Sequence, residues 1–368
     1  MTVARELIVS ARADVRGVPL YDPDQTVCAV DVGDNVNLWG APPAALRAIA
    51  NADVASVSRY PSVYSMPLRD AVLRYLGLAT TNGIGIVTGC GSDDVLDATI
   101  RAFGEPGDAI AFPAPTFAMI PIFARLNGLV PVAIPMTNDF DVDAQRLVDR
   151  GAKITYLCTP NNPTSTALPR ATVEYVASHA VGLVIIDEAY AEFAPEDFAS
   201  LVETNERVLV VRTFSKAFGL AGLRIGFGVG SEAIVDLIAR ARGPYKVNAL
   251  AEAAALAALA DGPDASGWVE RHAALAVEAR QFLTTELRAL GIEPLPSAAN
   301  FLFVPTPEAH ALAMAMRRRG VQVRALSGLP RDLSALDASG GHALRIGVGP
   351  RDVMERVLET LREVIVCA

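Results

Sequence analysis

The stretch VLVVRTFSKAFGLAGLRIGFGVG, residues 208–230, contains two apolar runs separated by a lysine and a glycine-rich turn. Five similar runs precede it, at 84–89, 109–114, 130–135, 154–160 and 182–190, each rich in Val or Ile or closed by Gly or Pro. Segments with helical spacing lie between them, such as SDDVLDATIRAF at 92–103. Strands that alternate with helices favour a parallel sheet covered on both faces. The sequence therefore predicts an α/β protein with a central, mainly parallel, seven-stranded sheet.

The pattern changes after about residue 231. NALAEAAALAALADG (248–262) predicts an Ala-rich helix, and WVERHAALAVEARQFLTTELRALG (268–291) predicts a long amphipathic helix that ends at Gly291. Three strand-like runs follow, at 300–306, 321–326 and 343–349, separated by helical pieces. This order predicts a smaller α+β domain behind the large one.

Composition argues against several classes of protein. The net charge is −9, and RRR at 317–319 is the only basic run, so we expect no nucleic-acid surface. No segment approaches 18 uncharged apolar residues, and the first residues lack a signal-peptide core, so we expect no membrane association. The four cysteines are scattered, which favours reduced thiols and a cytoplasmic location. The four histidines form no ligand spacing, and we predict no metal site.

Lys216 stands at the end of an apolar run in a chain with 29 arginines and only two other lysines, Lys153 and Lys246. A neutral lysine amine can form a Schiff base with an aldehyde, whereas an arginine cannot. Asp187 ends the apolar run GLVIIDEAY (182–190), where a carboxylate is costly unless it meets a cation such as a protonated ring nitrogen. A surface lysine and a structural salt bridge are the alternatives for these two residues.

Three further motifs follow strand-like runs. TGCGSDD (88–94) opens a helix and could place backbone N–H groups around a phosphate. TPNNPTS (159–165) presents Asn162, whose amide could donate to a phenolate, although turn geometry alone could explain it. Arg224 could bind a phosphate through two hydrogen bonds. Taken together with Lys216 and Asp187, these residues describe one ligand, pyridoxal 5′-phosphate.

The sequence also resembles a known family over nearly its whole length. The motifs are RYPSVYSMPLRDAV, TGCGSDDVLDATIRAFGEPGD, PNNPTS, VIIDEAYAEF, TFSKAFGLAGLRIGFGVG, PYKVN, ANFLFV and ALRIGVG. They are similar to fold-type I, class II aminotransferases, above all to histidinol-phosphate aminotransferases. The resemblance implies an aspartate aminotransferase-like fold. Its expected parts are an N-terminal arm with part of the small domain (1–45), a large cofactor-binding domain (46–250) and a small C-terminal domain (251–368).

The resemblance also assigns roles to residues. Lys216 would form the aldimine with the cofactor and move a proton, Asp187 would pair with the ring nitrogen, and Asn162 and Tyr190 would bind the ring phenolate. Phe117 would stack on the ring. The phosphate would be held by the remaining cofactor residues, which are Gly91, Ser92, Asp93, Thr213, Ser215 and Arg224. Tyr60 would reach the phosphate of a neighbouring subunit, which makes the expected active unit a homodimer.

Substrate binding is expected at Arg345, which would grip an α-carboxylate, and at Tyr21 and Arg324, which would help to bind the far end of histidinol phosphate. Trp39, Gly40 and Asn162 complete the predicted substrate site. The chain departs from the family pattern in NVNLWG (35–40) and in TPNNPTS (159–165). An aromatic amino acid would suit Trp39 and Phe117 about as well as histidinol phosphate does.

The leading prediction is an aminotransferase that uses histidinol phosphate with glutamate and 2-oxoglutarate. An aromatic amino acid aminotransferase is the nearest alternative, and a threonine-phosphate decarboxylase on the same scaffold is a further one. A non-catalytic sensor domain of a transcription regulator would need a DNA-binding module, for which this chain has no spare length.

Overall fold

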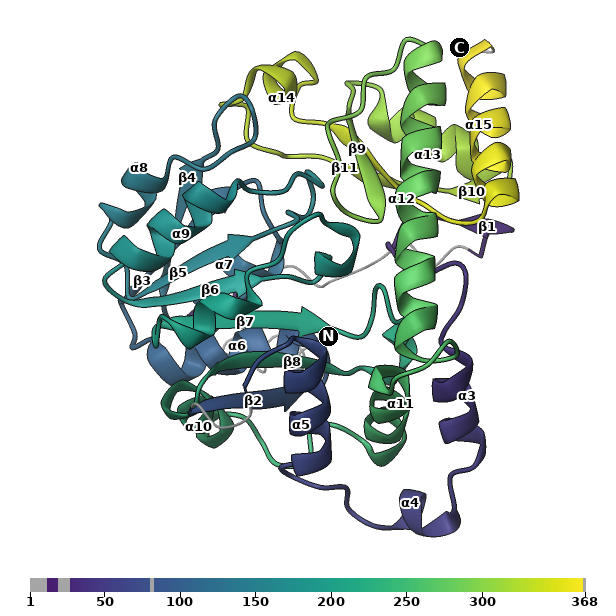
Figure 1. The fold of residues 1–368 in the computed structure, drawn as a ribbon. Helices are drawn as coiled ribbons and strands as arrows, with labels where there is room; N and C mark the ends of the chain where they lie inside the picture. Colours follow the sequence, from purple (N-terminus) through teal and green to yellow (C-terminus); the bar gives the residue numbers. More distant parts are fainter. Residues whose placement is uncertain (1–11, 19–26, 80–82, 367–368) are drawn as a thin grey trace, which may run out of the picture.

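The computed structural model describes residues 12–18, 27–79 and 83–366 (Figure 1). One large sheet occupies the middle of the fold. Its strands are β2 (Ile84–Gly89), β3 (Ala109–Ala114), β4 (Val130–Pro135), β5 (Ile154–Cys158), β6 (Leu183–Asp187), β7 (Val208–Thr213) and β8 (Gly226–Ser231). They lie in the order β2-β8-β7-β6-β5-β3-β4, and β8 runs opposite to the other six strands. All seven predicted strands are therefore present, and the prediction of a mainly parallel sheet is confirmed.

Helices cover both faces of this sheet. Its helices are α5 (Met66–Tyr75), α6 (Ser92–Phe103), α7 (Met119–Leu126), α8 (Ala144–Val148), α9 (Arg170–His179) and α10 (Glu232–Ala241). Short 3-10 turns are η1 (Ala191–Phe193), η2 (Ala199–Glu203) and η3 (Ala221–Leu223).

Strand β6 shows why the predicted runs are apolar throughout. Side chains alternate between the two faces of a strand. Leu183 and Ile185 pack in the core that contains residues of α6, α7 and α10, whereas Val184 and Ile186 pack in the core that contains residues of α8 and α9. Because both faces are covered, both sets of side chains must be apolar.

The remaining elements lie outside the large sheet. They are α2 (Ala13–Arg16), β1 (Val30–Asp31), α3 (Pro43–Ala50), α4 (Val54–Ser58), α11 (Ala249–Leu259), α12 (Ser266–Ala289), β9 (Phe301–Pro305), α13 (Ala309–Arg318), β10 (Val321–Gln322), β11 (Arg324–Leu326), α14 (Ser334–Ala338), β12 (Ala343–Gly347) and α15 (Arg351–Val366). β11, β12 and β9 form an antiparallel sheet, and β1 pairs in parallel with β10.

The C-terminal elements from α12 to α15 form a second part of the molecule, whereas α2 packs on α7, and α11 packs on α3, α4 and α5. The pairing of Val30 with Val321 brings the N-terminal segment to the C-terminal part of the chain. The long helix α12 extends along both parts (Figure 1). The β1–β10 pairing places residues 30–31 beside the C-terminal part, and the domain boundaries 1–45, 46–250 and 251–368 stay a prediction. None of the helices in the described ranges is long and apolar enough to cross a membrane.

Candidate functional site

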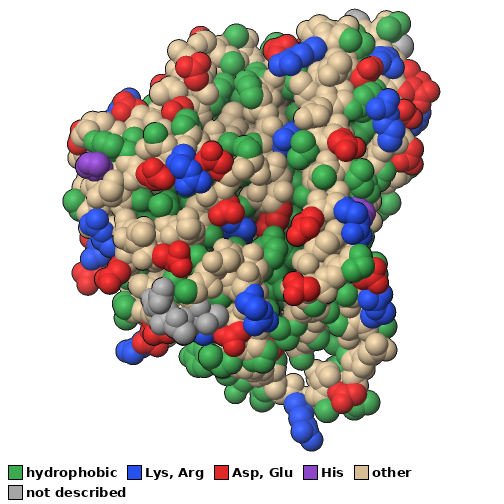
Figure 2. All heavy atoms as spheres, viewed as in Figure 1, with side chains coloured by type: hydrophobic (Ala, Val, Ile, Leu, Met, Phe, Trp, Pro, Cys, Tyr) green, Lys and Arg blue, Asp and Glu red, His purple; other side chains and the backbone are tan. Residues whose placement is uncertain are grey.

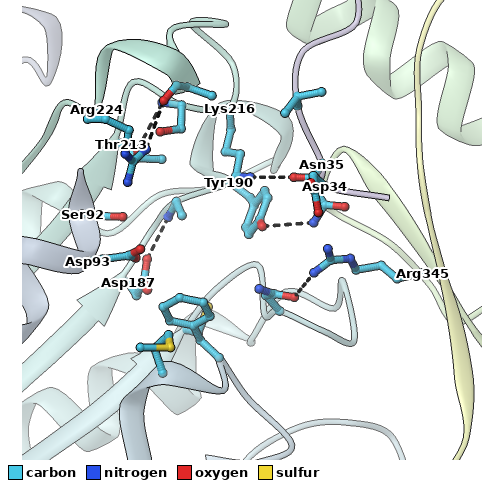
Figure 3. A pocket seen from close by; sticks show the side chains of 18 residues that line it. Asp34, Asn35, Ser92, Asp93, Asp187, Tyr190, Thr213, Lys216, Arg224 and Arg345 are labelled. Atoms are coloured by element: carbon cyan, nitrogen blue, oxygen red, sulfur yellow. Dashed lines mark hydrogen bonds between the residues drawn. The ribbon is translucent and has the colours of Figure 1, made fainter. Parts of the chain in front are cut away.

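A cavity of about 520 Å³ lies at the carboxyl ends of the central strands (Figure 3). Cys158, Asp187 and Thr213 are the last residues of β5, β6 and β7, and all three line it. Arg345 of β12 and the segment 34–36 close the opposite side. Ligands of open α/β sheets bind at this edge, because the strand ends direct their loops to one place.

Most of the residues predicted for the site lie together in this cavity. Those that line it are Ser92, Asp93, Phe117, Asn162, Asp187, Tyr190, Thr213, Ser215, Lys216, Arg224 and Arg345. They come from strand ends, loops, strand β12 and the start of α6, which are far apart in the sequence. The agreement follows from the parallel sheet, which places the loops after β2, β3, β5, β6 and β7 at one edge.

Lys216 follows β7 in the turn before η3, and its side chain extends into the cavity beside Tyr190. Its Nζ donates a hydrogen bond to the backbone oxygen of Asp34 at 3.1 Å. Burial, and then the positive charge of Arg345, lower the pKa of Lys216 to about 8. The amine is therefore far more often neutral at physiological pH than an ordinary lysine, as a nucleophile requires.

Asp187 is buried at the end of β6, and burial raises its pKa to about 6. The Tyr156 hydroxyl donates to Oδ2 at 2.7 Å, and the Ala189 N–H donates to Oδ1 at 3.1 Å; both donors counteract the effect of burial. Asp187 is thus mostly ionised at neutral pH and fixed in orientation. A buried carboxylate of this kind can pair with a cationic ring nitrogen.

The turn between β2 and α6 has the chemistry of a phosphate site. Gly91 has φ +81°, and a Cβ at this position would lie 2.6 Å from Nη2 of Arg224. A Cβ on Gly226 would lie 2.4 Å from the backbone N of Ser92. The glycines let β8 and Arg224 approach the N-terminus of α6, a 12-residue helix whose first N–H groups attract anions. The hydroxyls of Ser92, Thr213 and Ser215 line the same cavity.

Asp94 stabilises the turn between β2 and α6. Its Oδ2 accepts from the Cys90 N–H at 3.0 Å, and its Oδ1 accepts from Lys246 Nζ at 2.8 Å. Lys246 is thus engaged in a structural ion pair, and Lys153 is exposed just before the amino end of β5. Of the three lysines, only Lys216 lines the cavity.

Tyr190 and Arg345 lie on the side of the cavity away from Ser92 and Asp93 (Figure 3), and Asn162 also lines the cavity. Arg345 donates to Asn162 Oδ1 at 2.9 Å and to the Gly33 backbone oxygen at 2.7 Å. Asn35 donates to the Tyr190 hydroxyl at 3.2 Å. Burial raises the pKa of Tyr190 to about 12, so its hydroxyl stays protonated and can donate. An anion beside Arg345 would therefore meet a cation that is already oriented.

Five predicted residues lie outside the cavity lining, and one of them, Gly91, immediately precedes the lining residue Ser92. Tyr60 is 83% exposed and stacks on Tyr245, with ring centroids 4.6 Å apart. Trp39 packs edge-on against His272 of α12. The backbone oxygen of Gly40 lies against Gly219. Arg324 forms an ion pair with Asp34, which does line the cavity. Tyr21 falls outside the described residues.

Glu188, next to Asp187, belongs to a buried ion-pair cluster. Arg212 of β7 lies 2.8 Å from Glu188 and 3.6 Å from Glu192, and its side chain is 5% exposed. Tyr75 donates to Glu192 at 3.3 Å. These contacts hold the segment that carries Tyr190 against the sheet, so Glu188 has a structural role rather than that of a second acid.

Sequence reasoning missed several residues that build the site, namely Asp34, Asn35, Val36, Met119 and Tyr156. Tyr156 had a usable signal, since a hydroxyl inside the apolar run ITYLCTP needs a polar partner. Asn35 begins the stretch NVNLWG (35–40), which departs from the family pattern, whereas Asp34 had no signal in the sequence. They reach the cavity because β1 pairs with β10.

Comparisons with known proteins agree with this geometry. Residues 28–361 match the family described as aminotransferase class I and II. A histidinol-phosphate aminotransferase of Roseiflexus castenholzii is 38% identical over 344 residues, which are 90% of this chain and 88% of that protein. The structure of a histidinol-phosphate aminotransferase from Sinorhizobium meliloti in complex with pyridoxal 5′-phosphate has a TM-score of 0.83 and 26% identity, covering 98% and 99% of the two chains. A variant of Thermus thermophilus aspartate aminotransferase has a TM-score of 0.80 at 21% identity, covering 96% and 99%, and confirms the fold class.

Proposed function

The chain belongs to the class I and II aminotransferase family, and from that premise we propose that it uses pyridoxal 5′-phosphate to move an amino group between histidinol phosphate and 2-oxoglutarate. One observation carries the proposal. A single cavity contains an amine of lowered pKa, a buried carboxylate, hydroxyl groups beside the N-terminus of α6 that suit a phosphate, and an arginine that suits a substrate anion. In this transfer 2-oxoglutarate accepts the amino group and becomes glutamate.

The donor set fits the cofactor. The hydroxyls of Ser92, Thr213 and Ser215 and the guanidinium of Arg224 suit a phosphate. Asp187 suits a protonated ring nitrogen, and Asn162 and Tyr190 suit a ring oxygen. Phe117 borders the cavity where a flat ring could stack on it. When bound, pyridoxal 5′-phosphate supplies an aldehyde for the amino group and a ring that withdraws electrons.

The remaining chemistry belongs to the side chains of this chain. We assign Lys216 two tasks, namely binding the cofactor through Nζ and taking a proton from the substrate's α-carbon. A neutral amine can do both, and the lowered pKa of Lys216 favours that form. Arg345 would hold an anionic group of the substrate, and its bonds to Asn162 and Gly33 fix the guanidinium beforehand.

We propose histidinol phosphate because two similar proteins, from Roseiflexus castenholzii and Sinorhizobium meliloti, are named histidinol-phosphate aminotransferases. Each matches most of this chain. The aromatic alternative rested on Trp39, and this side chain packs against His272, outside the cavity lining. Of the two residues that favoured an aromatic substrate, Phe117 alone lines the cavity.

A donor panel tests the proposal. The cofactor-loaded protein is mixed with histidinol phosphate, phenylalanine, glutamate or threonine phosphate, and the spectral change from the aldehyde form to the amine form of the cofactor is followed. Histidinol phosphate and glutamate are expected to react fastest. A clear preference for phenylalanine would replace the first substrate, and carbon dioxide release from threonine phosphate would indicate the decarboxylase.

We further propose that the active unit is a homodimer in which Tyr60 reaches the cavity of the second copy. Support comes from exposed apolar side chains on and near α4, which are Val54, Val57, Tyr60, Tyr64 and Met66, exposed by 55–83%. Hydrophobic side chains gather on the lower part of the face shown, whereas charged groups of both signs are interspersed elsewhere (Figure 2). Light scattering of the wild type and of V57E, a charge placed in this patch, tests the assembly; a monomeric wild type would exclude it.

The cytoplasmic location also stays a proposal. It rests on the scattered cysteines, and fractionation of cells that make the protein would test it.

A further inference from the structure

Arg324 and Arg345 lie directly opposite each other on the neighbouring strands β11 and β12. Two cations in this position repel each other unless anions lie nearby. Arg345 lines the cavity, but Arg324 does not. Asp34 lines the cavity on the same side as Arg345, and its Oδ1 forms an ion pair with Nη2 of Arg324.

The backbone around Asp34 is firmly held. Its carbonyl oxygen accepts from Lys216 Nζ at 3.1 Å, and the next residue, Asn35, is 2% exposed with φ +54°. The Asn35 oxygen accepts from Asn300 at 3.1 Å, and its side chain donates to Tyr190. The carboxylate of Asp34 is less confined, since its side chain is 52% exposed. The carboxylate can therefore move while its backbone stays in place.

We propose that Asp34 is a specificity-determining residue, which covers Arg324 and makes a second anionic group on the substrate compete for that guanidinium. A ligand with one anion can bind Arg345 without disturbing Asp34. A ligand with two anions must displace the Asp34 carboxylate from Arg324 or lie beside it, and like charges in contact are costly. The inference rests on the proposed aminotransferase function, because it assumes that substrates enter this cavity with an anion at Arg345.

Two ligands that cannot react measure the effect by binding alone. Glutarate carries a second carboxylate, and pentanoate is the five-carbon acid without it. Calorimetry gives the Kd of each for the cofactor-loaded wild type and for D34N, which removes the charge of the side chain and keeps its size. We expect D34N to bind glutarate about tenfold more tightly, while the Kd of pentanoate changes less than about twofold.

A double-mutant cycle adds R324Q. In D34N the gain for glutarate should disappear when Arg324 is also replaced, because the freed guanidinium is its cause. Equal changes for both ligands would indicate a structural role and overturn the proposal. An unchanged glutarate Kd in D34N, or a wild type that binds neither ligand, would overturn it as well. Failure of the proposed amino-group transfer appears in the donor panel instead, and so is distinguishable from failure of this inference.

Discussion

The lowered pKa of Lys216 predicts how fast the cofactor attaches at each pH. With a pKa of about 8, roughly a tenth of the amine is neutral at pH 7 and about nine-tenths at pH 9. An ordinary lysine with a pKa of 10.5 would be neutral in only about three molecules in ten thousand at pH 7. The attachment rate should thus rise about tenfold between pH 7 and pH 9 and then level off.

The assay mixes cofactor-free protein with pyridoxal 5′-phosphate and follows the absorption of the lysine-bound form between pH 7 and pH 10. K216A supplies the background from Lys153 and Lys246. R345Q removes a positive charge that lowers the pKa of Lys216, so in this variant the attachment rate should level off at a higher pH. A wild-type rate that keeps rising tenfold per pH unit up to pH 10 would refute the reasoning, because it would mean an unperturbed amine.

Three other changes test the surroundings of the site. In Y156F, Asp187 loses a hydroxyl donor that lowers its pKa, so we expect the pKa of Asp187 to rise further. The Kd of the cofactor should increase about tenfold or more. Calorimetry checks this, and an unchanged Kd would mean that the hydroxyl is unimportant. G226A should displace the N-terminus of α6 and weaken cofactor binding, whereas G222A, which has open space around it, should not; equal Kd values would contradict the close packing. R212M leaves Glu188 and Glu192 buried without their cation, and denaturant unfolding should show a loss of about 3–5 kcal/mol, against about 0.5 or less for the exposed R240M.

Much of the fold follows from local pattern. The runs at 182–187 and 208–213 are apolar on both faces, and this alone indicates strands in a covered, mainly parallel sheet. Parallel strands bring their carboxyl ends to one edge, so Asp187 and Lys216 could be expected in one cavity. Family resemblance then supplied roles for them that the pattern could not.

Only the tertiary structure decided which distant groups meet at the site. The contact of Asp34 with Arg324 joins residues 290 positions apart, and it depends on the pairing of β1 with β10, which two-residue strands do not reveal in the sequence. Likewise Trp39, predicted to border the substrate, is turned towards His272. Local spacing determines which face a side chain occupies on its own strand or helix. The partner across a cavity is determined by how separate elements pack, and that depends on contacts along the whole chain.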